Sequence, residues 1–143
     1  MELLAKHVAN SFVLSMTARQ ITQLYQESIA AIGQGNFKLL DIVHHLTAGM
    51  KATATEMSYI GLDEMRQSCG GAGFLLSSGI ANIWAEQAPV TTFEGVNVVM
   101  FQQSARLLLK NCTKVNGGKQ PQPYFAYLAT HEALLAKNTR KTD

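Results

Sequence analysis

The spacing of apolar side chains is the feature that most limits the folds open to this chain. In the first segment, apolar residues recur at intervals of three and four, which is the period of one face of an α-helix. This stripe consists of Leu14, Ala18, Ile21, Tyr25, Ile29 and Ile32, and a shorter one of Leu4, Val8 and Phe12 precedes it. The pattern returns late in the chain at Val98, Phe101, Ala105, Leu108 and Cys112. No stretch has the composition of a β-strand, so the sequence predicts an all-α fold.

Turn-forming residues mark where these helices are expected to end. Gly33-Gln34-Gly35-Asn36 tolerates a left-handed backbone and closes the first helix, and Gly61 is expected to interrupt the second. Helices are expected at about residues 2–32, 37–59, 62–69, 78–87, 95–112 and 124–137. The expected division is a helical domain at 1–112, a linker rich in glycine and proline at 113–123, and a terminal helix with a polar tail at 124–143.

The proportions of apolar and charged residues limit the kinds of molecule that this chain is expected to bind. Of the 143 residues, 47% are apolar and 15% are charged, which suggests that some apolar surface faces another domain or subunit. The net charge of +2 is too small to indicate binding to nucleic acid. No apolar run approaches the roughly 20 residues that a membrane-spanning helix needs. No N-terminal signal pattern is present either.

Metal, disulfide and glycan sites are not expected. His44 and His45 are adjacent, so on a helix their side chains point about 100° apart and cannot easily share an ion. Cys69 and Cys112 match no metal spacing and are too few for a disulfide framework, which indicates buried thiols in a reducing compartment. Asn111-Cys112-Thr113 has the glycosylation spacing, but no secretory signal accompanies it.

A single carboxylate, Glu94, lies at the entrance to the last apolar stripe. Thr91 and Glu94 have the T-x-x-E spacing of a capping box, in which side chains satisfy the free N–H groups of a helix start. For an isolated T-x-x-E this structural interpretation is the more frequent one. The second interpretation, a catalytic base, depends on the sequence around Glu94.

That surrounding sequence resembles one family of enzymes. The stretches MRQSCGGAGF (65–74), SSGIANIWAEQAPVTTFEG (77–95) and NVVMFQQSARLLLK (97–110) follow the order of the C-terminal helical domain of the FAD-dependent acyl-CoA oxidases. HHLTAGMKATATE (44–56) also resembles their A-[GA]-[LM]-K pattern, which lies on a helix that lines the active-site domain. The resemblance is specific over about residues 39–110, and it implies an up-down helical bundle.

The resemblance also implies a reaction. In these oxidases the glutamate of the T-[FY]-E-G motif removes the α-proton of an acyl-CoA thioester while the β-hydride passes to FAD, and O2 then receives the electrons. The products are a trans-2-enoyl-CoA and hydrogen peroxide. By this resemblance Glu94 is the catalytic base, and its backbone N–H is one donor to the thioester oxygen. Phe93 and Gly95 are expected at the substrate, with the Glu94 carboxylate desolvated beside Phe93.

The glycine cluster is the expected contact with the cofactor. By the same resemblance, Gly70 and Gly71 lie against the FAD pyrophosphate of the neighbouring subunit, because backbone amides freed by glycine suit an anion. Gln67 and Arg66, one turn earlier, and Asn97 of the motif after Glu94 are further expected contacts.

Three positions depart from the family pattern. Where the oxidases read G-G-H-G-Y and E-G-[DE]-N, this chain carries Ala72, Phe74 and Val96. Each replacement removes a polar side chain, so contacts through these side chains are not expected. Contacts through backbone amides are retained.

The length of the chain leaves two interpretations open. The N-terminal helical domain, the β-barrel and the second C-terminal domain of the oxidases do not fit into 143 residues, so we expect a piece of an oxidase. In the first interpretation the chain represents an acyl-CoA oxidase, from a family that forms homodimers and resides in peroxisomes. The peroxisomal Ser-Lys-Leu signal is missing from the end of this chain. Apart from the resemblance, the expected location is therefore the cytoplasm. In the second, it is a catalytically silent helical module for interaction or oligomerisation.

Overall fold

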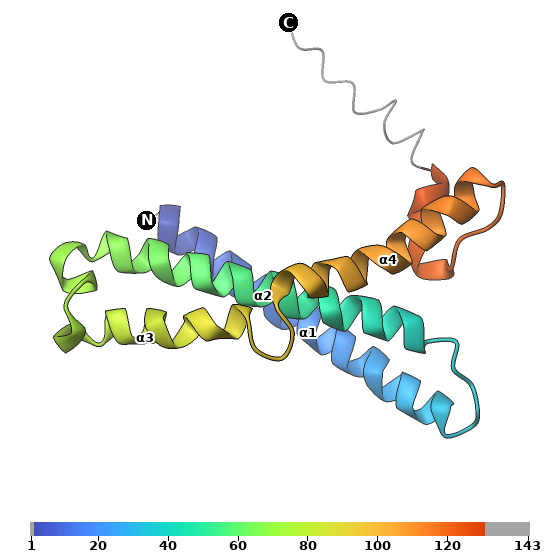
Figure 1. The fold of residues 1–143 in the computed structure, drawn as a ribbon, viewed down its shortest axis with the longest axis horizontal. Coiled ribbons are helices and arrows are strands. Elements are labelled where there is room, and N and C mark those ends of the chain that lie inside the picture. Colours follow the sequence, from blue (N-terminus) through green and yellow to red (C-terminus); the bar gives the residue numbers. More distant parts are fainter. Residues whose placement is uncertain (1, 131–143) are drawn as a thin grey trace, which may run out of the picture. The chain divides into compact units, whose positions relative to one another are not determined.

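The computed structural model describes residues 2–130, and it is helical throughout its regular elements (Figure 1). The α-helices are α1 (Glu2–Ile32), α2 (Leu40–Ser68), α3 (Ile80–Gln87) and α4 (Asn97–Asn116). Short 3-10 segments are η1 (Gly70–Gly73), η2 (Leu76–Ser78), η3 (Ala88–Thr91) and η4 (Pro123–Thr130). No strand occurs within the described residues, so the predicted all-α class is confirmed.

The chain divides within α4 into two compact units, residues 1–104 and the residues from 105 onward. Helix α4 continues to Asn116, past residue 113 where the linker was expected to begin. The last expected helix, 124–137, corresponds to the 3-10 segment η4 as far as Thr130, and its remainder lies outside the described residues.

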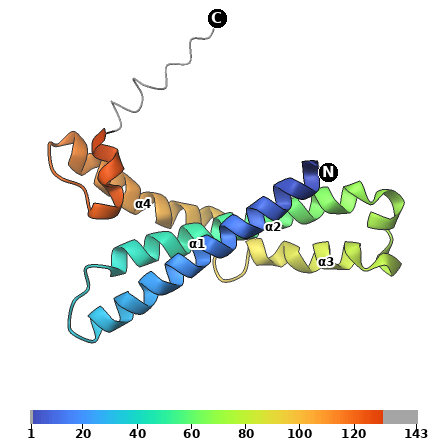
Figure 2. The same cartoon turned by 180° about the vertical axis from the view of Figure 1, so that it is seen from behind.

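In the first unit, α1 and α2 run antiparallel and side by side (Figures 1 and 2). The start of α1 meets the end of α2, where Nζ of Lys6 lies 2.7 Å from Oε2 of Glu64. Nε2 of His7 lies 2.9 Å from the same oxygen, although the geometry is not that of a hydrogen bond. The hydrogen bond from Lys6 lowers the pKa of Glu64. Helix α3 packs along the C-terminal half of α2, where Trp84 stacks on Tyr59 with 5.6 Å between ring centroids.

Gly61 does not interrupt α2, so the expected break between residues 59 and 62 is wrong. Gly61 is buried, and a Cβ at this position would lie 3.0 Å from Nδ1 of His7. The glycine therefore makes room for a side chain of α1. Its low helix propensity is overridden, because the turns on either side are held by packing against neighbouring helices.

The buried apolar core of the described residues is small. It consists of Leu24, Ile42, Val43, Ala48, Ala52, Leu107 and Phe125. Of the first predicted stripe, Tyr25 and Ile29 are exposed, as are Leu4, Val8 and Phe12 of the shorter stripe. Helical periodicity was therefore a good guide to the helix and a poor guide to burial.

The second unit is organised by one buried amide. Asn111 is 0% exposed, and its Oδ1 accepts a 2.8 Å hydrogen bond from the backbone N–H of Gln122. Its Nδ2 donates to the carbonyl of Leu107 at 2.9 Å. This pairing ties the chain after α4 back onto the helix. Asn111 is also removed from solvent, so in the folded chain its side chain is not accessible for glycosylation.

The contact between Gly61 and His7 predicts opposite effects of one substitution in two backgrounds. In the parent chain, Gly61→Ala should lower the free energy of unfolding by about 1 kcal/mol, because the His7 ring must move. In a His7→Ala chain, the same substitution should raise it by about 0.5–1 kcal/mol, since only the helix propensity of alanine remains. Urea unfolding followed by circular dichroism measures both. Equal effects in the two backgrounds would show that His7 does not set the requirement for glycine.

Candidate active site

The segment between η3 and α4 carries Glu94, and it is a tight turn, not a helix start. Thr91 is the last residue of η3, where its Oγ1 donates to the carbonyl of Ala88 at 2.9 Å. Helix α4 begins only at Asn97. The capping-box interpretation of Thr91 and Glu94 is therefore wrong. Instead, the carbonyl of Pro89 accepts the backbone N–H groups of Thr92 and Phe93, both at 2.9 Å.

The backbone at Glu94 is in the left-handed region. Glu94 has φ 56°, the one positive value for a non-glycine among residues 2–130, and Gly95 follows with φ 103°. Residues with a Cβ rarely adopt this conformation, and such outliers persist only where their surroundings hold them. A Cβ on Gly95 would also lie 2.7 Å from Cε of Met100. The turn thus requires glycine after Glu94.

Lys51 of α2 reaches this turn from the neighbouring helix. Its Nζ donates to the carbonyl of Gly95 at 2.6 Å and to Oδ1 of Asn97 at 2.9 Å. Hydrogen bonds from a charged donor are the stronger ones, so this pair fixes the turn firmly against α2. The segment containing Lys51 resembled the family pattern, but the sequence did not indicate that this side chain serves the turn.

The side chain of Asn97 is buried and fully used within the chain. It is 6% exposed, and its Oδ1 also accepts from Oγ1 of Thr55 at 3.0 Å. Its Nδ2 donates to the carbonyl of Ala52 at 3.3 Å and to Oε2 of Glu56 at 3.0 Å. As the structure places it, Asn97 joins the start of α4 to α2.

Glu94 itself is exposed, and its reactive groups are unengaged. Across the described part of the chain, its carboxylate makes no hydrogen bond or ion pair, and no acceptor binds its backbone N–H. Phe93 beside it is 50% exposed. The expected desolvation of the carboxylate is therefore absent in this chain alone. What the turn does present is a carboxylate and a free N–H donor on one residue, held in a fixed backbone conformation.

The glycine cluster forms the 3-10 segment η1 at the end of α2. Gly70 has φ 57°, and a Cβ on Gly71 would meet no atom within 4 Å. Both glycines are exposed, whereas Gly73 is buried against α2, where a Cβ would overlap the carbonyl of Arg66. The glycines of this cluster therefore serve different purposes. Gly73 allows packing, and the open space at Gly71 leaves room for a group from outside the chain.

Arg66 and Gln67 are turned toward a carboxylate of their own helix. Nη2 of Arg66 and Nε2 of Gln67 donate to the two oxygens of Asp63, each at 2.6 Å. The hydrogen bond from Arg66, followed by that from Gln67, lowers the pKa of Asp63. The guanidinium also lies over the Trp84 ring, 5.0 Å from its centroid. The two side chains would have to leave these partners to reach a phosphate.

The remaining candidate residues do not form a second site. His45 is held by Ser104, whose carbonyl lies 2.7 Å from Nδ1, and residues 2–130 contain no cluster of three or more possible metal ligands. Cys69 is exposed and Cys112 half-buried, so the expectation of two buried thiols is wrong for Cys69. Among the described helices, none is long and apolar enough to cross a membrane.

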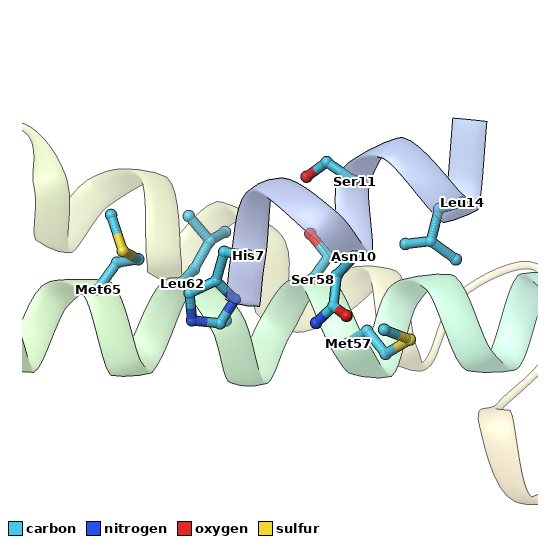
Figure 3. Close-up of a pocket in the computed structure, with 9 residues that line it drawn as sticks. His7, Asn10, Ser11, Leu14, Met57, Ser58, Leu62 and Met65 are labelled. Carbon is cyan, nitrogen blue, oxygen red and sulfur yellow. The ribbon is translucent and has the colours of Figure 1, made fainter. Parts of the chain in front are cut away.

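A groove of about 240 Å³ lies between α1 and α2 (Figure 3). It is lined by His7, Asn10, Ser11, Leu14, Met57, Ser58, Gly61, Leu62 and Met65. A neighbouring groove of about 380 Å³ shares Asn10, Leu14 and Met57 with it and extends toward Ser104. Glu94 lines neither groove, and neither is lined by a carboxylate.

Comparison with known proteins gives one consistent result. The family model of the acyl-CoA oxidase C-alpha1 domain matches residues 1–109. The mouse protein "Peroxisomal acyl-coenzyme A oxidase 1" is 40% identical over 121 residues, which cover 85% of this chain and 18% of the mouse protein. The chain thus spans less than a fifth of the length of this relative.

Solved structures agree with the sequence match. Acyl-CoA oxidase 1 of Arabidopsis thaliana superposes with a TM-score of 0.76 at 34% identity, covering 83% of this chain and 18% of that one. Acyl-CoA oxidase-1 of Caenorhabditis elegans, solved in complex with FAD and ATP, gives a TM-score of 0.73 at 33% identity. That match covers 78% of this chain and 17% of the nematode protein.

The different roles of the glycines predict different costs of adding a methyl group. Gly73→Ala should lower the free energy of unfolding by about 1–3 kcal/mol, because the Cβ would overlap the Arg66 carbonyl. Gly71→Ala should change it by no more than about 0.5 kcal/mol, since the space around it is open. Urea unfolding of the two variants beside the parent chain makes the comparison. A similar loss in both would contradict the assignment of Gly71 to an external contact.

Proposed function

The chain belongs to the acyl-CoA oxidase C-alpha1 domain family, and on that premise we propose that it carries the catalytic base of an acyl-CoA oxidase. The proposed reaction converts acyl-CoA to trans-2-enoyl-CoA with reduction of O2 to hydrogen peroxide. Because the chain spans only 18% of its mouse relative, we propose that it contributes part of the site and is weakly active or inactive alone.

One observation carries this proposal, namely that the carboxylate and the N–H of Glu94 are both open on a turn that is fixed to α2. The carboxylate would take the α-proton of the thioester, and the N–H would donate to the thioester oxygen as negative charge develops there. A donor fixed in advance lowers the barrier more than one that must first be ordered. Phe93 beside it is exposed and Gly95 is half-buried, and these two residues are the proposed substrate contacts.

The residues present fit a flavin at the glycine turn. Gly70 and Gly71 are exposed and unobstructed, so their backbone could lie against the pyrophosphate of FAD. A bound flavin would accept the β-hydride and pass the electrons to O2. Arg66, Gln67 and Asn97 remain weaker candidates for this contact, because each is engaged within the chain. The residues that depart from the family pattern, Ala72, Phe74 and Val96, would make no polar contact.

Assembly and location follow the same premise. We propose that the chain functions within a homodimer, in which Phe74, 77% exposed beside the glycine turn, would be covered. Peroxisomal residence is proposed from the relatives, since the mouse protein is named as peroxisomal.

A second candidate is a catalytically silent module for interaction or oligomerisation. The observation that favours it is the apolar stripe of Leu4, Val8 and Phe12, which is exposed along the first turns of α1. Such a surface marks a place where another chain packs. This candidate needs neither FAD nor the Glu94 carboxylate, which separates it from the first.

Binding of FAD to the purified chain tests the proposal. Titration followed by calorimetry and flavin absorbance should show saturable binding, because the glycine turn is open before the cofactor arrives. Gly71→Leu should weaken binding at least tenfold by filling that space, without loss of stability. The control is Gln26→Leu, which places a leucine on the exposed face of α1 and should bind as the parent does.

The base is tested by peroxide formation with acyl-CoA in the FAD-loaded chain. Any activity of the parent should fall by at least a hundredfold in Glu94→Gln, which removes the proton acceptor and keeps the shape. Absence of FAD binding up to high micromolar concentration would overturn the flavin contact and favour the silent module. Measurable peroxide formation by the parent that is equally fast in Glu94→Gln would overturn the role of the base.

A further inference from the structure

We propose that Lys51 is a positioning residue for Glu94, which it serves by holding the backbone of the following turn through its ammonium group. The inference rests on the proposed function, because it concerns the placement of the proposed base. Lys51 would touch neither substrate nor flavin. Its effect would pass through the peptide groups that it binds.

The geometry places one cation across both ends of a short segment. Nζ of Lys51 binds the carbonyl of Gly95 at 2.6 Å and Oδ1 of Asn97 at 2.9 Å, so that only Val96 lies between the two acceptors. Lys51 itself is fixed on α2, where it is half-buried. The two bonds therefore tie the residues directly after Glu94 to a long helix.

The need for such a tie arises from the backbone of Glu94. Its φ of 56° is disfavoured for a residue with a Cβ, and the adjacent Gly95 at φ 103° is a flexible link. Without an external restraint, the pair would relax toward the common regions of the backbone map. In that case the carboxylate and the N–H of Glu94 would no longer have fixed positions and directions.

Other contacts restrain the ends of the turn but do not replace Lys51. The Pro89 carbonyl holds the N–H groups of Thr92 and Phe93, which lie before Glu94. Thr55 and Ala52 hold the amide of Asn97, which begins α4. Among the described residues, Lys51 alone supplies a side-chain bond to the backbone of the Glu94–Gly95 pair.

A purely structural role, in which Lys51 only adds stability to the helix contact, predicts a different outcome. Removal of the ammonium would then lower the stability and leave the conformation of Glu94 unchanged. A positioning role predicts a change at Glu94 itself. The two are separated by a signal that reports φ at residue 94.

Nuclear magnetic resonance of the isotopically labelled chain provides that signal. A positive φ brings the amide proton of a residue close to its own Hα, which gives a strong intraresidue cross-peak. The parent chain should show this cross-peak at Glu94. Lys51→Met, which keeps an unbranched side chain only one atom shorter and loses the charge, should weaken it by at least half and broaden the amide of Glu94.

Lys6→Met is the matched control. It removes an ammonium that also binds across helices, at Glu64, but lies far along α2 from the turn. It should leave the Glu94 cross-peak at its parent strength whatever it does to the thermal midpoint. Lys51→Arg, which keeps the charge and the donors, should restore the cross-peak at least in part. If Lys51→Met does not fold, as judged by circular dichroism, the polar and uncharged Lys51→Gln takes its place.

A second measurement exploits the strain at Glu94. Glu94→Gly should raise the urea midpoint of the parent chain, because glycine adopts a positive φ without penalty. In the Lys51→Met background it should raise the midpoint less, since the unrestrained turn has already relaxed. The same shift in both backgrounds, or a Glu94 cross-peak unaffected by Lys51→Met, would overturn the inference.

Neither measurement uses flavin or acyl-CoA. A chain that bound no FAD would overturn the proposed flavin contact, whereas the role of Lys51 would still be decided by the cross-peak. Conversely, a chain that bound FAD but showed no change in Lys51→Met would keep its proposed function and lose its positioning residue.

Discussion

The absence of side-chain bulk along α2 is the constraint on which the first unit depends. Ala48 and Ala52 are buried, and a Cβ on Gly49 would lie 2.9 Å from Oγ of Ser104, so the backbone of α2 is approached closely. The Asn97 amide donates to the Ala52 carbonyl of this helix at 3.3 Å. Small residues of α2 thus accompany the hydrogen bonds that hold the segment after Glu94 against this helix.

The two halves of the candidate site are held in different ways. The turn that carries Glu94 is fixed by side chains, above all Lys51 and Asn97, which reach across from one helix to another. The glycine turn is fixed by close contact of backbone, with Gly73 packed on the carbonyl of Arg66. A substitution in the Glu94 turn would change where the Glu94 side chain points. A substitution in the glycine turn would change how closely its backbone packs on α2. Both turns share α2 as their base, so a single helix would relate the proposed proton acceptor to the proposed cofactor surface.

The sequence predicted what depends on local pattern and missed what depends on distant contacts. The extent of α1 and the all-α class follow from the spacing of apolar residues. Glu94 and the glycine cluster are proposed as site residues from their motifs, and this assignment stays a prediction. Gly61 was misjudged, because its reason for being glycine is the His7 ring on another helix. The capping box at Thr91 failed because the helix starts at Asn97, whose side chain is anchored on α2. No local sequence pattern indicates that Lys51 binds the turn, because both of its acceptors lie far along the chain.

The fixed turn has a thermodynamic consequence for any molecule that meets Glu94. Its left-handed backbone is already formed in the chain without ligand, so the entropy of ordering this segment is lost on folding and not on binding. An incoming thioester would then meet a preorganised surface, and its affinity would not be reduced by the cost of arranging the loop. The fold therefore bears the cost of the unfavourable backbone at Glu94, and a ligand that binds there does not.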